Sequence, residues 1–384
     1  MSKAIGYSLN AFPSDTLDEI RATLSGPARL LGRAAAGPEP LAVELRLGAP
    51  AIEAVRREGR AAELEDLLAS AGLRCVSLNG FPLSPFHARR VKEDVFRPSW
   101  LEEDRVRLTL ELAEIGAALA AEGDATTLST LSGSFKPWGD GPEVRSAVAR
   151  NVARAADGLR GLFERTGRRV VLCVEAEPFT TFETLPEIVE LFERTGPHPH
   201  LAANLDCSHQ AVEFEDPDAW METLKARSIP LGKVHLTHAL SVKSPGSNPA
   251  GIAAIRRLKE ERYLHQTIAG SPGAVSSRAA DIPDLDIPGA AARAFRGAAE
   301  ARVHFHLPLF LEGGGGFETT HEWTARALRG AWSRDECRHF MIETYTWSVL
   351  AGRGVVEAPR APEDLAPLMA REIEWARAVV GRRP

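Results

Sequence analysis

Several acidic and imidazole side chains follow short apolar runs in the second half of the chain. The run "RVVLCVEAEP" ends with Glu175 and Glu177, and "HLAANLDCSH" ends with Asp206 and His209. Similar runs further along the chain carry His235, His238, His304, His306 and Glu343. Carboxylate oxygens and imidazole nitrogens together suit Mn²⁺, Mg²⁺, Co²⁺, Fe²⁺ or Zn²⁺ rather than a thiolate-bound metal. Because buried carboxylates that lie close together need a cation or protons, the pattern predicts a divalent metal site.

Each of these residues, taken alone, is also typical of a structural role. A glutamate at the end of a strand often caps the next helix or pairs with an arginine. A histidine on an apolar strand is often a hydrogen-bonded core residue. The prediction of a metal site therefore rests on the recurrence of such residues at successive strand ends.

The stretch "NLDCSHQAVEF" places three chemically capable groups within four positions. We expect Asp206 to be a metal ligand. Side chains alternate along a strand, so Cys207 should face away from Asp206 and pack as a buried thiol. His209 should lie on the side of Asp206, where it orients a bound water or a substrate hydroxyl, or binds a second metal.

Other polar and aromatic residues near strand ends are weaker candidates. Asn10 and Asn79, in "SLNAFP" and "SLNGFP", could bind a hydroxyl or carbonyl, or simply form turns beside proline. Lys136 in "SGSFKPW" could pair with an anionic substrate group or remain a solvated loop residue. Tyr345 in "ETYTW" could belong to an aromatic wall of the site or to core packing.

The elements that must position these residues are alternating strands and helices. Such alternation indicates βαβ units and a parallel sheet, and eight units favour a closed (β/α)8 TIM barrel, an α/β fold. No G-x-G-x-x-G follows the first strand, which argues against a nucleotide-binding sheet. In such barrels the active site lies at the C-terminal ends of the strands, where the acids and histidines fall. The predicted strand segments are 4–10, 41–48, 74–83, 125–133, 169–178, 200–209, 232–240 and 338–347.

About a hundred residues separate the last two predicted strands, too many for one helix and two loops. They include two further strand-like runs, "ERYLHQTIA" and "ARVHFHLPLFLE". We predict a single domain over 1–384 with an insertion between strands seven and eight, over 241–312, which forms a hairpin or a small lid at the barrel mouth. The alternative is that "VHFHLPLFL" is itself barrel strand seven.

Composition narrows the class of protein. The 384 residues are 44% hydrophobic and 26% charged with a net charge of −6, which is typical of a soluble globular protein. The sequence has no block of basic residues, so we expect no binding to nucleic acid. The four cysteines are scattered, the first residues do not read as a signal peptide, and no apolar run is long enough to span a membrane. We therefore expect a cytoplasmic protein.

The longer motifs resemble a known family. The order Glu, Asp, His, Glu over the last four strands resembles the xylose isomerase-like superfamily of TIM barrels. The stretches "SLNGFPLSPFHARRVKEDVF", "LDCSHQAVEFEDP", "YLHQT", "VHFHLPLFLE" and "ETYTW" resemble, more narrowly, the EboE-type "metabolite traffic protein" family. The superfamily resemblance implies Glu175, Asp206, His235 and Glu343 as metal ligands. In the EboE-type family the position of His235 is often glutamine, in which case His306 would supply the imidazole.

The resemblance also implies a function. It predicts a metal-dependent isomerase or epimerase of a small hydroxylated or carbonyl metabolite, with Glu175 and Glu343 as the catalytic carboxylates that move the proton. The alternatives are a metallohydrolase or lyase, and a non-catalytic carrier or assembly partner of a membrane prenyltransferase-like protein from the same operon. The expected substrate-binding residues are His209, Glu177, His238, His304, Asn79, Lys136 and Tyr345.

Overall fold

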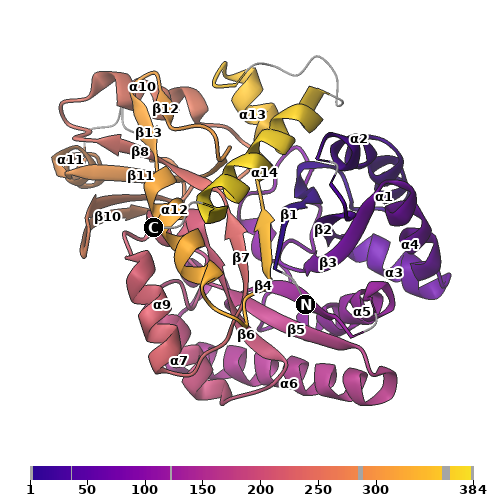
Figure 1. Cartoon of the computed structure of the whole chain (residues 1–384). Helices are drawn as coiled ribbons and strands as arrows, with labels where there is room; N and C mark the ends of the chain where they lie inside the picture. Colours follow the sequence, from indigo (N-terminus) through magenta and orange to yellow (C-terminus); the bar gives the residue numbers. More distant parts are fainter. Residues whose placement is uncertain (1–2, 36, 122, 284–288, 357–363, 382–384) are drawn as a thin grey trace.

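The computed structural model describes residues 3–35, 37–121, 123–283, 289–356 and 364–381. Eight parallel strands close into a barrel in the order β1-β14-β7-β6-β5-β4-β3-β2 (Figure 1). This confirms the predicted TIM barrel. The barrel strands are β1 (Ala4–Ser8), β2 (Leu41–Arg46), β3 (Leu73–Asn79), β4 (Ala125–Leu131), β5 (Arg169–Glu175), β6 (Leu201–Asp206), β7 (Leu231–Leu236) and β14 (His339–Ile342).

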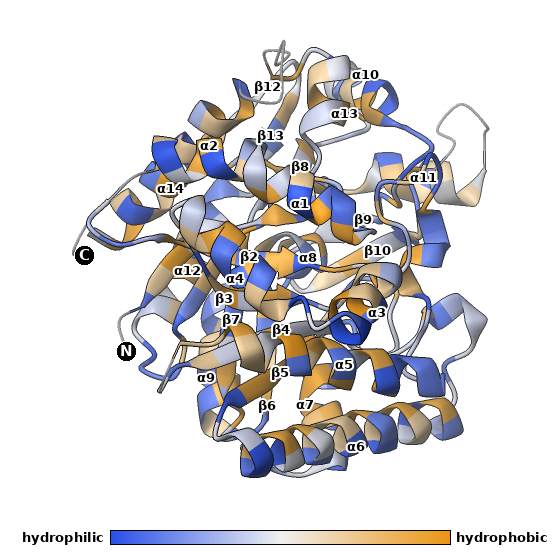
Figure 2. Cartoon of the chain, turned by 90° about the vertical axis from the view of Figure 1, so that its right-hand side faces the viewer, coloured by the Kyte–Doolittle hydropathy of each residue, from blue (hydrophilic) through white to orange (hydrophobic). Residues whose placement is uncertain are grey.

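Amphipathic helices surround the barrel strands (Figure 2). In α6, Val148, Val152, Ala155 and Leu159 recur at helical spacing and are buried, so one face of the helix packs on the barrel. The helices of this layer are α1 (Leu17–Ser25), α2 (Pro27–Ala34), α3 (Ala49–Arg57), α4 (Ala61–Ser70), α5 (Glu103–Leu119), α6 (Pro142–Thr166), α7 (Leu185–Thr195), α9 (Pro217–Ala226), α12 (His321–Trp332) and α14 (Leu365–Gly381). Shorter helical segments are η1 (Leu9–Ala11), η2 (Lys92–Phe96), η3 (Lys136–Trp138), α8 (Cys207–Val212), α10 (Pro249–Leu258), α11 (Ala290–Gly297) and α13 (Trp347–Gly352).

A second sheet is inserted between β7 and β14. Its six strands pair antiparallel in the order β10-β9-β11-β8-β13-β12, and it lies beside the barrel at the upper left of Figure 1. The strands are β8 (His238–Lys243), β9 (Thr267–Ser271), β10 (Ala274–Ala279), β11 (Glu300–Leu307), β12 (Gly313–Gly314) and β13 (Phe317–Thr319). The insertion is therefore larger than the hairpin that we considered, and residues 284–288 within it lie outside the described residues.

The inserted sheet overturns the alternative assignment of barrel strand seven. The run "VHFHLPLFL" contributes to β11, which pairs with β8 and β9, whereas β7 takes the seventh place in the barrel. The sheet also has its own hydrophobic core, which includes Leu240, Ile255, Phe295, Val303 and Phe305. The pairing of β11 with β8 and β9 thus places this run in the inserted sheet and not in the barrel.

Hydrogen bonds join β11 to the mouth of the barrel. Ser208 Oγ donates to the Phe305 carbonyl over 2.9 Å, and Thr237 Oγ1 donates to the Leu307 carbonyl over 3.2 Å. Thr237 is the one residue between β7 and β8, so the inserted sheet starts directly at the C-terminal end of a barrel strand. These contacts hold the side chains of β11 beside the strand ends that carry the predicted metal ligands.

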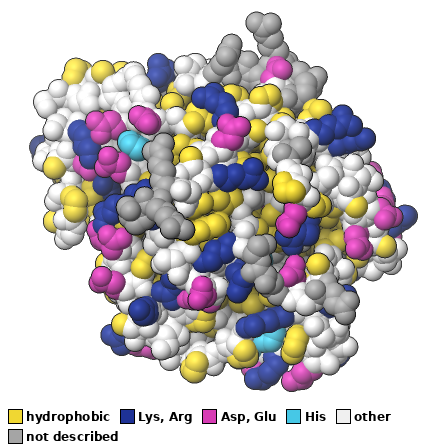
Figure 3. All heavy atoms as spheres, viewed as in Figure 1, with side chains coloured by type: hydrophobic (Ala, Val, Ile, Leu, Met, Phe, Trp, Pro, Cys, Tyr) yellow, Lys and Arg dark blue, Asp and Glu magenta, His cyan; other side chains and the backbone are white. Residues whose placement is uncertain are grey.

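The face of the molecule in Figure 3 carries acidic and basic side chains in a mixed arrangement. No large area of that face has a single charge, in keeping with the moderate net charge of −6. Among the helices that the structure describes, none combines the length and the apolar character needed to cross a membrane.

Candidate metal centre

Four of the predicted ligands converge at the C-terminal end of the barrel. Glu175 ends β5, Asp206 ends β6, His235 lies on β7, and Glu343 follows β14. All four are buried, and one potential ligand atom of each lies within 4.8 Å of the others. His235 Nδ1 is 3.0 Å from Glu343 Oε2, 3.2 Å from Glu175 Oε2 and 3.8 Å from Asp206 Oδ2. The four strand ends thus form one group, which we call the carboxylate-imidazole site.

The three carboxylates of this site destabilise one another's charged forms. Burial raises the pKa of Glu175 and Glu343 well above the usual value, and the other carboxylates of the site raise both further. Burial also raises the pKa of Asp206, partly offset by the nearby His209. Asp206 Oδ2 is buried and accepts no hydrogen bond from any described residue. This site therefore needs either protons or a cation, and its oxygen and nitrogen donors fit a divalent metal.

Helix α8 explains the spacing between Asp206 and His209. Asp206 is the N-cap of α8, and its Oδ1 accepts a 2.8 Å hydrogen bond from the backbone N–H of His209. Cys207 is the first residue of the helix and is fully buried in the main core. Burial and the adjacent Asp206 raise the pKa of its thiol well above the usual value, so Cys207 is a packing residue. The strand alternation that we used to place Cys207 does not continue beyond Asp206.

Glu44 orients His235, and the sequence analysis missed this residue. Glu44 lies in the middle of β2, is completely buried, and receives a 3.1 Å hydrogen bond from His235 Nε2–H. It also forms an ion pair with the buried Lys233. Asn204 Nδ2 lies 3.2 Å from His235 Nδ1 and donates to Glu175 over 2.7 Å. Because Nε2 carries the proton, the lone pair of Nδ1 points toward the three carboxylates.

Replacing Glu44 with glutamine should weaken metal binding about 10- to 100-fold, which is the usual effect of changing the partner of a metal-binding histidine. The neutral amide holds the Nε2–H of His235 less firmly and lowers the basicity of Nδ1. Competition titration with a metal-binding dye measures the change. Ser77→Ala, which removes a 2.8 Å hydrogen bond to Glu44 but no contact with His235, is the matched control and should have a smaller effect. Equal metal affinity in the Glu44→Gln protein and the wild type would show that Glu44 has no such role.

Two amides hold Glu343 from the other side. Asn10 and Asn79 donate to Glu343 Oε1 over 2.6 and 2.7 Å, and Asn79 is also 3.4 Å from Glu44 Oε1. Asn79 was predicted to bind substrate, but its amide is used by these carboxylates. It therefore positions Glu343, and it is not among the residues that line the pocket described below.

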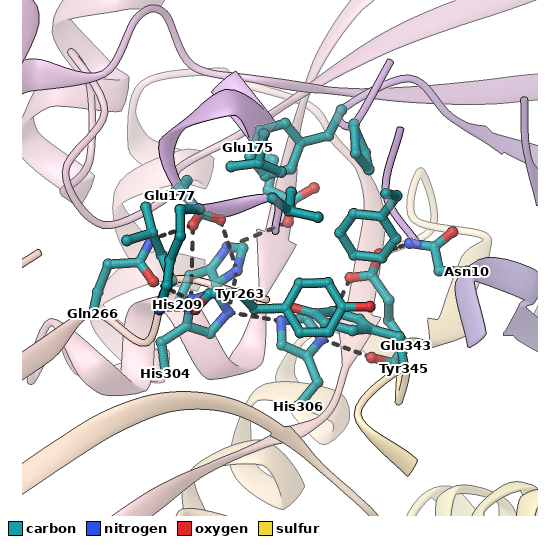
Figure 4. Close-up of a pocket in the computed structure, with 17 residues that line it drawn as sticks. Asn10, Glu175, Glu177, His209, Tyr263, Gln266, His304, His306, Glu343 and Tyr345 are labelled. Atoms are coloured by element: carbon teal, nitrogen blue, oxygen red, sulfur yellow. Dashed lines mark hydrogen bonds and ion pairs between the residues drawn. The ribbon is translucent and has the colours of Figure 1, made fainter. Parts of the chain in front are cut away.

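Two carboxylates of the carboxylate-imidazole site, Glu175 and Glu343, line a pocket (Figure 4). One wall is aromatic, because the rings of Phe86, Tyr263 and Tyr345 lie 5.0 to 5.1 Å apart. Another part of the lining, which we call the polar wall, consists of Glu177, His209, Gln266, His304 and His306, and the ring of His306 lies 4.5 Å from that of Tyr345. The predicted residues Glu177, His209, His304, His306 and Tyr345 thus all line the pocket, together with Phe86, Tyr263 and Gln266, which the sequence analysis missed.

His209 connects the polar wall to the carboxylate-imidazole site. Its Nδ1 is 3.3 Å from Glu175 Oε1, and its Nε2 is 2.9 Å from Glu177 Oε2. Burial lowers the pKa of His209, but Asp206 and Glu177 outweigh this effect and raise it to about 9. A charged His209 would partly balance the negative charge of the neighbouring carboxylates.

Lys136 and His238 lie outside the pocket, contrary to the prediction. Lys136 is in η3 and pairs with Glu183 over 2.6 Å and Glu187 over 3.0 Å, so its charge is already compensated. His238 is buried at the start of β8, where its ring nitrogens contact the Thr324 hydroxyl and the Leu309 carbonyl, each over 3.0 Å. Neither residue lines the pocket, so we do not include them in the proposed substrate-binding set.

The missed residues Glu44 and Lys233 had a signal in the sequence. Each is a charged residue within an otherwise apolar strand, in "LAVELRLG" and "GKVHLTHAL". Alternation places Lys233 on the same side of β7 as His235, which is the interior of the barrel. A charge in the interior of a barrel needs a partner of opposite sign, and this requirement could have paired Lys233 with Glu44.

Comparison with known proteins agrees with this fold. Residues 41–265, more than half of the chain, match the family described as the xylose isomerase-like TIM barrel. D-allulose 3-epimerase from Methylomonas sp. superposes with a TM-score of 0.52 at 15% identity, over 98% of this chain and 99% of the epimerase. The IolI protein, in a structure with a zinc atom, superposes with a TM-score of 0.52 at 11% identity, over 99% of this chain and 98% of IolI.

A search of curated proteins found no match to the chain. The family match covers β2 to β7, including Glu175, Asp206 and His235, and the two structures share the fold over nearly the whole length. The chain therefore belongs to the xylose isomerase-like TIM barrel family.

Proposed function

We propose that the protein is a metal-dependent isomerase or epimerase of a hydroxylated or carbonyl metabolite. The observation that carries this proposal is the carboxylate-imidazole site, two of whose carboxylates, Glu175 and Glu343, line a pocket. Two proteins of similar fold are an epimerase and a protein with bound zinc, and these similarities support the proposal of a metal-dependent epimerase or isomerase. Fold similarity at this identity does not choose a reaction, so the proposal rests on the donor atoms.

The ligands would be Glu175, Asp206, His235 through Nδ1, and Glu343. A divalent metal bound there supplies Lewis acidity, which makes the C–H bond beside a substrate carbonyl easier to deprotonate. The donor set of three carboxylates and one imidazole fits Mn²⁺, Mg²⁺, Co²⁺, Fe²⁺ or Zn²⁺. The buried Asp206 Oδ2, which accepts no hydrogen bond from the described residues, is the atom that most needs a cation.

The proton is moved by Glu175 and Glu343. Both line the pocket, where a carboxylate can reach a C–H group of a bound compound and act as its general base. Asn204 holds Glu175, whereas Asn10 and Asn79 hold Glu343, so each carboxylate keeps one oxygen fixed by an amide.

The aromatic wall of the pocket narrows the substrate class. Phe86, Tyr263 and Tyr345 present ring surfaces to a pocket whose other lining residues include polar side chains. A ligand that fits this lining has hydroxyl or carbonyl groups together with an apolar part. We also propose, from the sequence motifs alone, that the protein belongs to the EboE-type family. Membership would imply a role in processing a secondary-metabolite precursor, and a compound with both polar and apolar parts is compatible with that role.

Exchange of hydrogen with solvent tests the proposal. Manganese-loaded protein is incubated in D2O with a panel of ketoses and aromatic α-hydroxy ketones, and the compounds are analysed by mass spectrometry. We expect one deuterium at the carbon beside the carbonyl of an accepted compound, and loss of this exchange in Glu175→Gln and Glu343→Gln. Glu215→Gln, which alters a carboxylate bound to Leu185 and Trp220 outside the pocket, is the control and should retain it.

Two outcomes would contradict the proposal. One is a protein that binds no divalent metal. The other is metal-dependent conversion of a compound by hydrolysis with no deuterium at carbon, which would instead support a metallohydrolase.

A further inference from the structure

The pocket is too small to hold a metabolite in the conformation that the structure describes. Its free volume is about 40 Å³, which is room for a few water molecules. Pockets that bind small molecules usually measure about 300 to 1,000 Å³. A compound that reaches Glu175 and Glu343 must therefore displace part of the lining.

Two loops meet at the pocket, and we call them the barrel loop and the insert loop. The barrel loop, residues 80–96, follows β3 and ends with η2, whereas the insert loop, residues 259–266, connects α10 to β9. Both loops contribute side chains to the lining, and both also carry exposed residues, such as Asp94 and Glu261. The two loops therefore lie between the pocket and solvent.

The side chain of Lys92, in the barrel loop, joins the two loops. Its ammonium group donates to the carbonyls of Glu260 and Tyr263 over 2.9 and 2.7 Å, and it pairs with Asp281 over 2.6 Å. An ammonium group has three N–H donors, and these contacts use all three. Because only 12% of the Lys92 side chain is exposed, water can replace these bonds only when the loops part.

The backbone of Lys92 is held by the same contact between the loops. Its φ is 41°, in the left-handed region that residues other than glycine rarely adopt. The N–H groups of Val91 and Lys92 both donate to the Arg262 carbonyl over 2.8 Å. A strained conformation persists where the surrounding contacts outweigh its cost. Separation of the loops would release this strain, which offsets part of the loss of the hydrogen bonds.

We propose that the barrel loop and the insert loop form a gate, which opens to admit the metabolite, and that Lys92 is its latch. Residues 80–96 and 259–266, all of which the structure describes, contain no strand, so they can part without breaking a sheet. The histidines of the lining on β11, by contrast, are fixed by the pairing of that strand with β8 and β9. The inference rests on the proposed function in one respect, which is that the metabolite binds in this pocket.

The gate also supplies part of the surface that a bound compound contacts. Phe86 belongs to the barrel loop and Tyr263 to the insert loop, whereas Tyr345 follows β14 in the barrel. The rings of Phe86 and Tyr263 lie 5.0 and 5.1 Å from that of Tyr345. Two of the three rings of the aromatic wall therefore move with the gate. Its closure would bring them against the compound and keep water away from the carboxylates.

Labelling of a cysteine placed in the pocket tests the proposal on metal-free protein. The four native cysteines are buried, and Asn10→Cys puts a thiol at a position that lines the pocket. Iodoacetamide is added in the presence of a chelator, and the labelled fraction is followed by mass spectrometry. We expect slow labelling of the Asn10→Cys protein, and labelling about tenfold or more faster when Lys92→Met is added, because methionine loses all three hydrogen bonds. Lys136→Met, which breaks an ion pair with Glu183 outside the pocket, is the matched control and should leave the rate unchanged.

Urea separates opening of the gate from unfolding of the whole protein. Labelling through the gate should change little at urea concentrations below the unfolding transition, whereas labelling through unfolding rises steeply with urea. Hydrogen exchange, measured without the added cysteine, gives a second readout. We expect the amides of residues 91 and 92 to exchange faster in the Lys92→Met protein and those of β4 and β5 to be unchanged.

Three results would overturn the gate. The first is an equal labelling rate with and without Lys92→Met. The second is labelling of the Asn10→Cys protein as fast as that of the unfolded chain. The third is faster labelling in Lys92→Met that rises steeply with low concentrations of urea. Because these measurements use metal-free protein, they leave the proposed metal chemistry to its own test, and the two proposals fail separately.

Discussion

The Asp206→Asn protein is expected to be more stable than the wild type without metal and to gain little stability when metal is added. In the metal-free wild type, Asp206 lies buried among Glu175 and Glu343, and Oδ2 accepts no hydrogen bond from the described residues. Removing one carboxylate from this group should add on the order of 1 kcal/mol to the free energy of unfolding, because burial disfavours the charged form of Asp206 and His209 offsets this only in part. Asparagine is chosen because it also caps helices well, so α8 keeps its N-cap.

Added metal should stabilise the wild type more than the Asp206→Asn protein. At a metal concentration 100 times Kd, a protein that binds one ion is stabilised by about 2.7 kcal/mol. We expect the wild type to show a gain of this size with Mn²⁺ and the Asp206→Asn protein to lose most of it. Thermal unfolding with chelator and with Mn²⁺ measures both changes. Glu215→Gln is the control, which should keep the stabilisation by metal. A metal-free Asp206→Asn protein that is less stable than the wild type would contradict our description of the site.

The second large expected effect is on the pH dependence of stability. The free energy of unfolding of the metal-free protein and the strength of metal binding should change in opposite directions as pH rises. The pKa values of Glu175, Asp206 and Glu343 are raised in the folded protein, mainly by burial. In the unfolded chain such groups titrate near pH 4. Their contribution to stability is therefore complete below about pH 4 and is lost as pH rises through the folded-state pKa values. The metal-free protein should lose stability from pH 5 toward pH 8, whereas metal binding should strengthen over the same range because metal competes with protons.

Urea unfolding at a series of pH values, with chelator and with Mn²⁺, measures this behaviour. Other carboxylates also contribute, because burial raises the pKa of Glu213 to about 8 and that of Glu215 and Glu372 to about 7. The comparison is therefore made with the triple variant Glu175→Gln, Asp206→Asn and Glu343→Gln, which keeps those groups. A metal-free wild type with the same pH profile as this variant would show that the site carboxylates are not coupled to folding.

The ends of the barrel strands could be predicted because two local patterns coincide there. An apolar run followed by an acid marks the end of a strand, and parallel strands of a barrel bring such ends to one edge. Glu175, Asp206, His235 and Glu343 were placed in this way. Their convergence follows from topology alone and needs no knowledge of side-chain conformations.

The partners of these residues could not be predicted in the same way. The pairing of Glu44 with His235 joins residues on β2 and β7, nearly two hundred positions apart, and no local pattern links them. Likewise, His306 was considered as the imidazole of the carboxylate-imidazole site, but β11 places it with His209 and His304. The arrangement of an inserted antiparallel sheet depends on strand pairing, which short apolar runs do not specify.

A single residue between β7 and β8 connects the barrel to the inserted sheet. Thr237 leaves no flexible linker, and the bonds from Ser208 and Thr237 to β11 tie the second hydrophobic core to the barrel mouth. Deleting the insertion would therefore do more than remove a lid. It would leave the end of β7, and with it the strand that carries His235, without the hydrogen-bonded support that the inserted sheet provides.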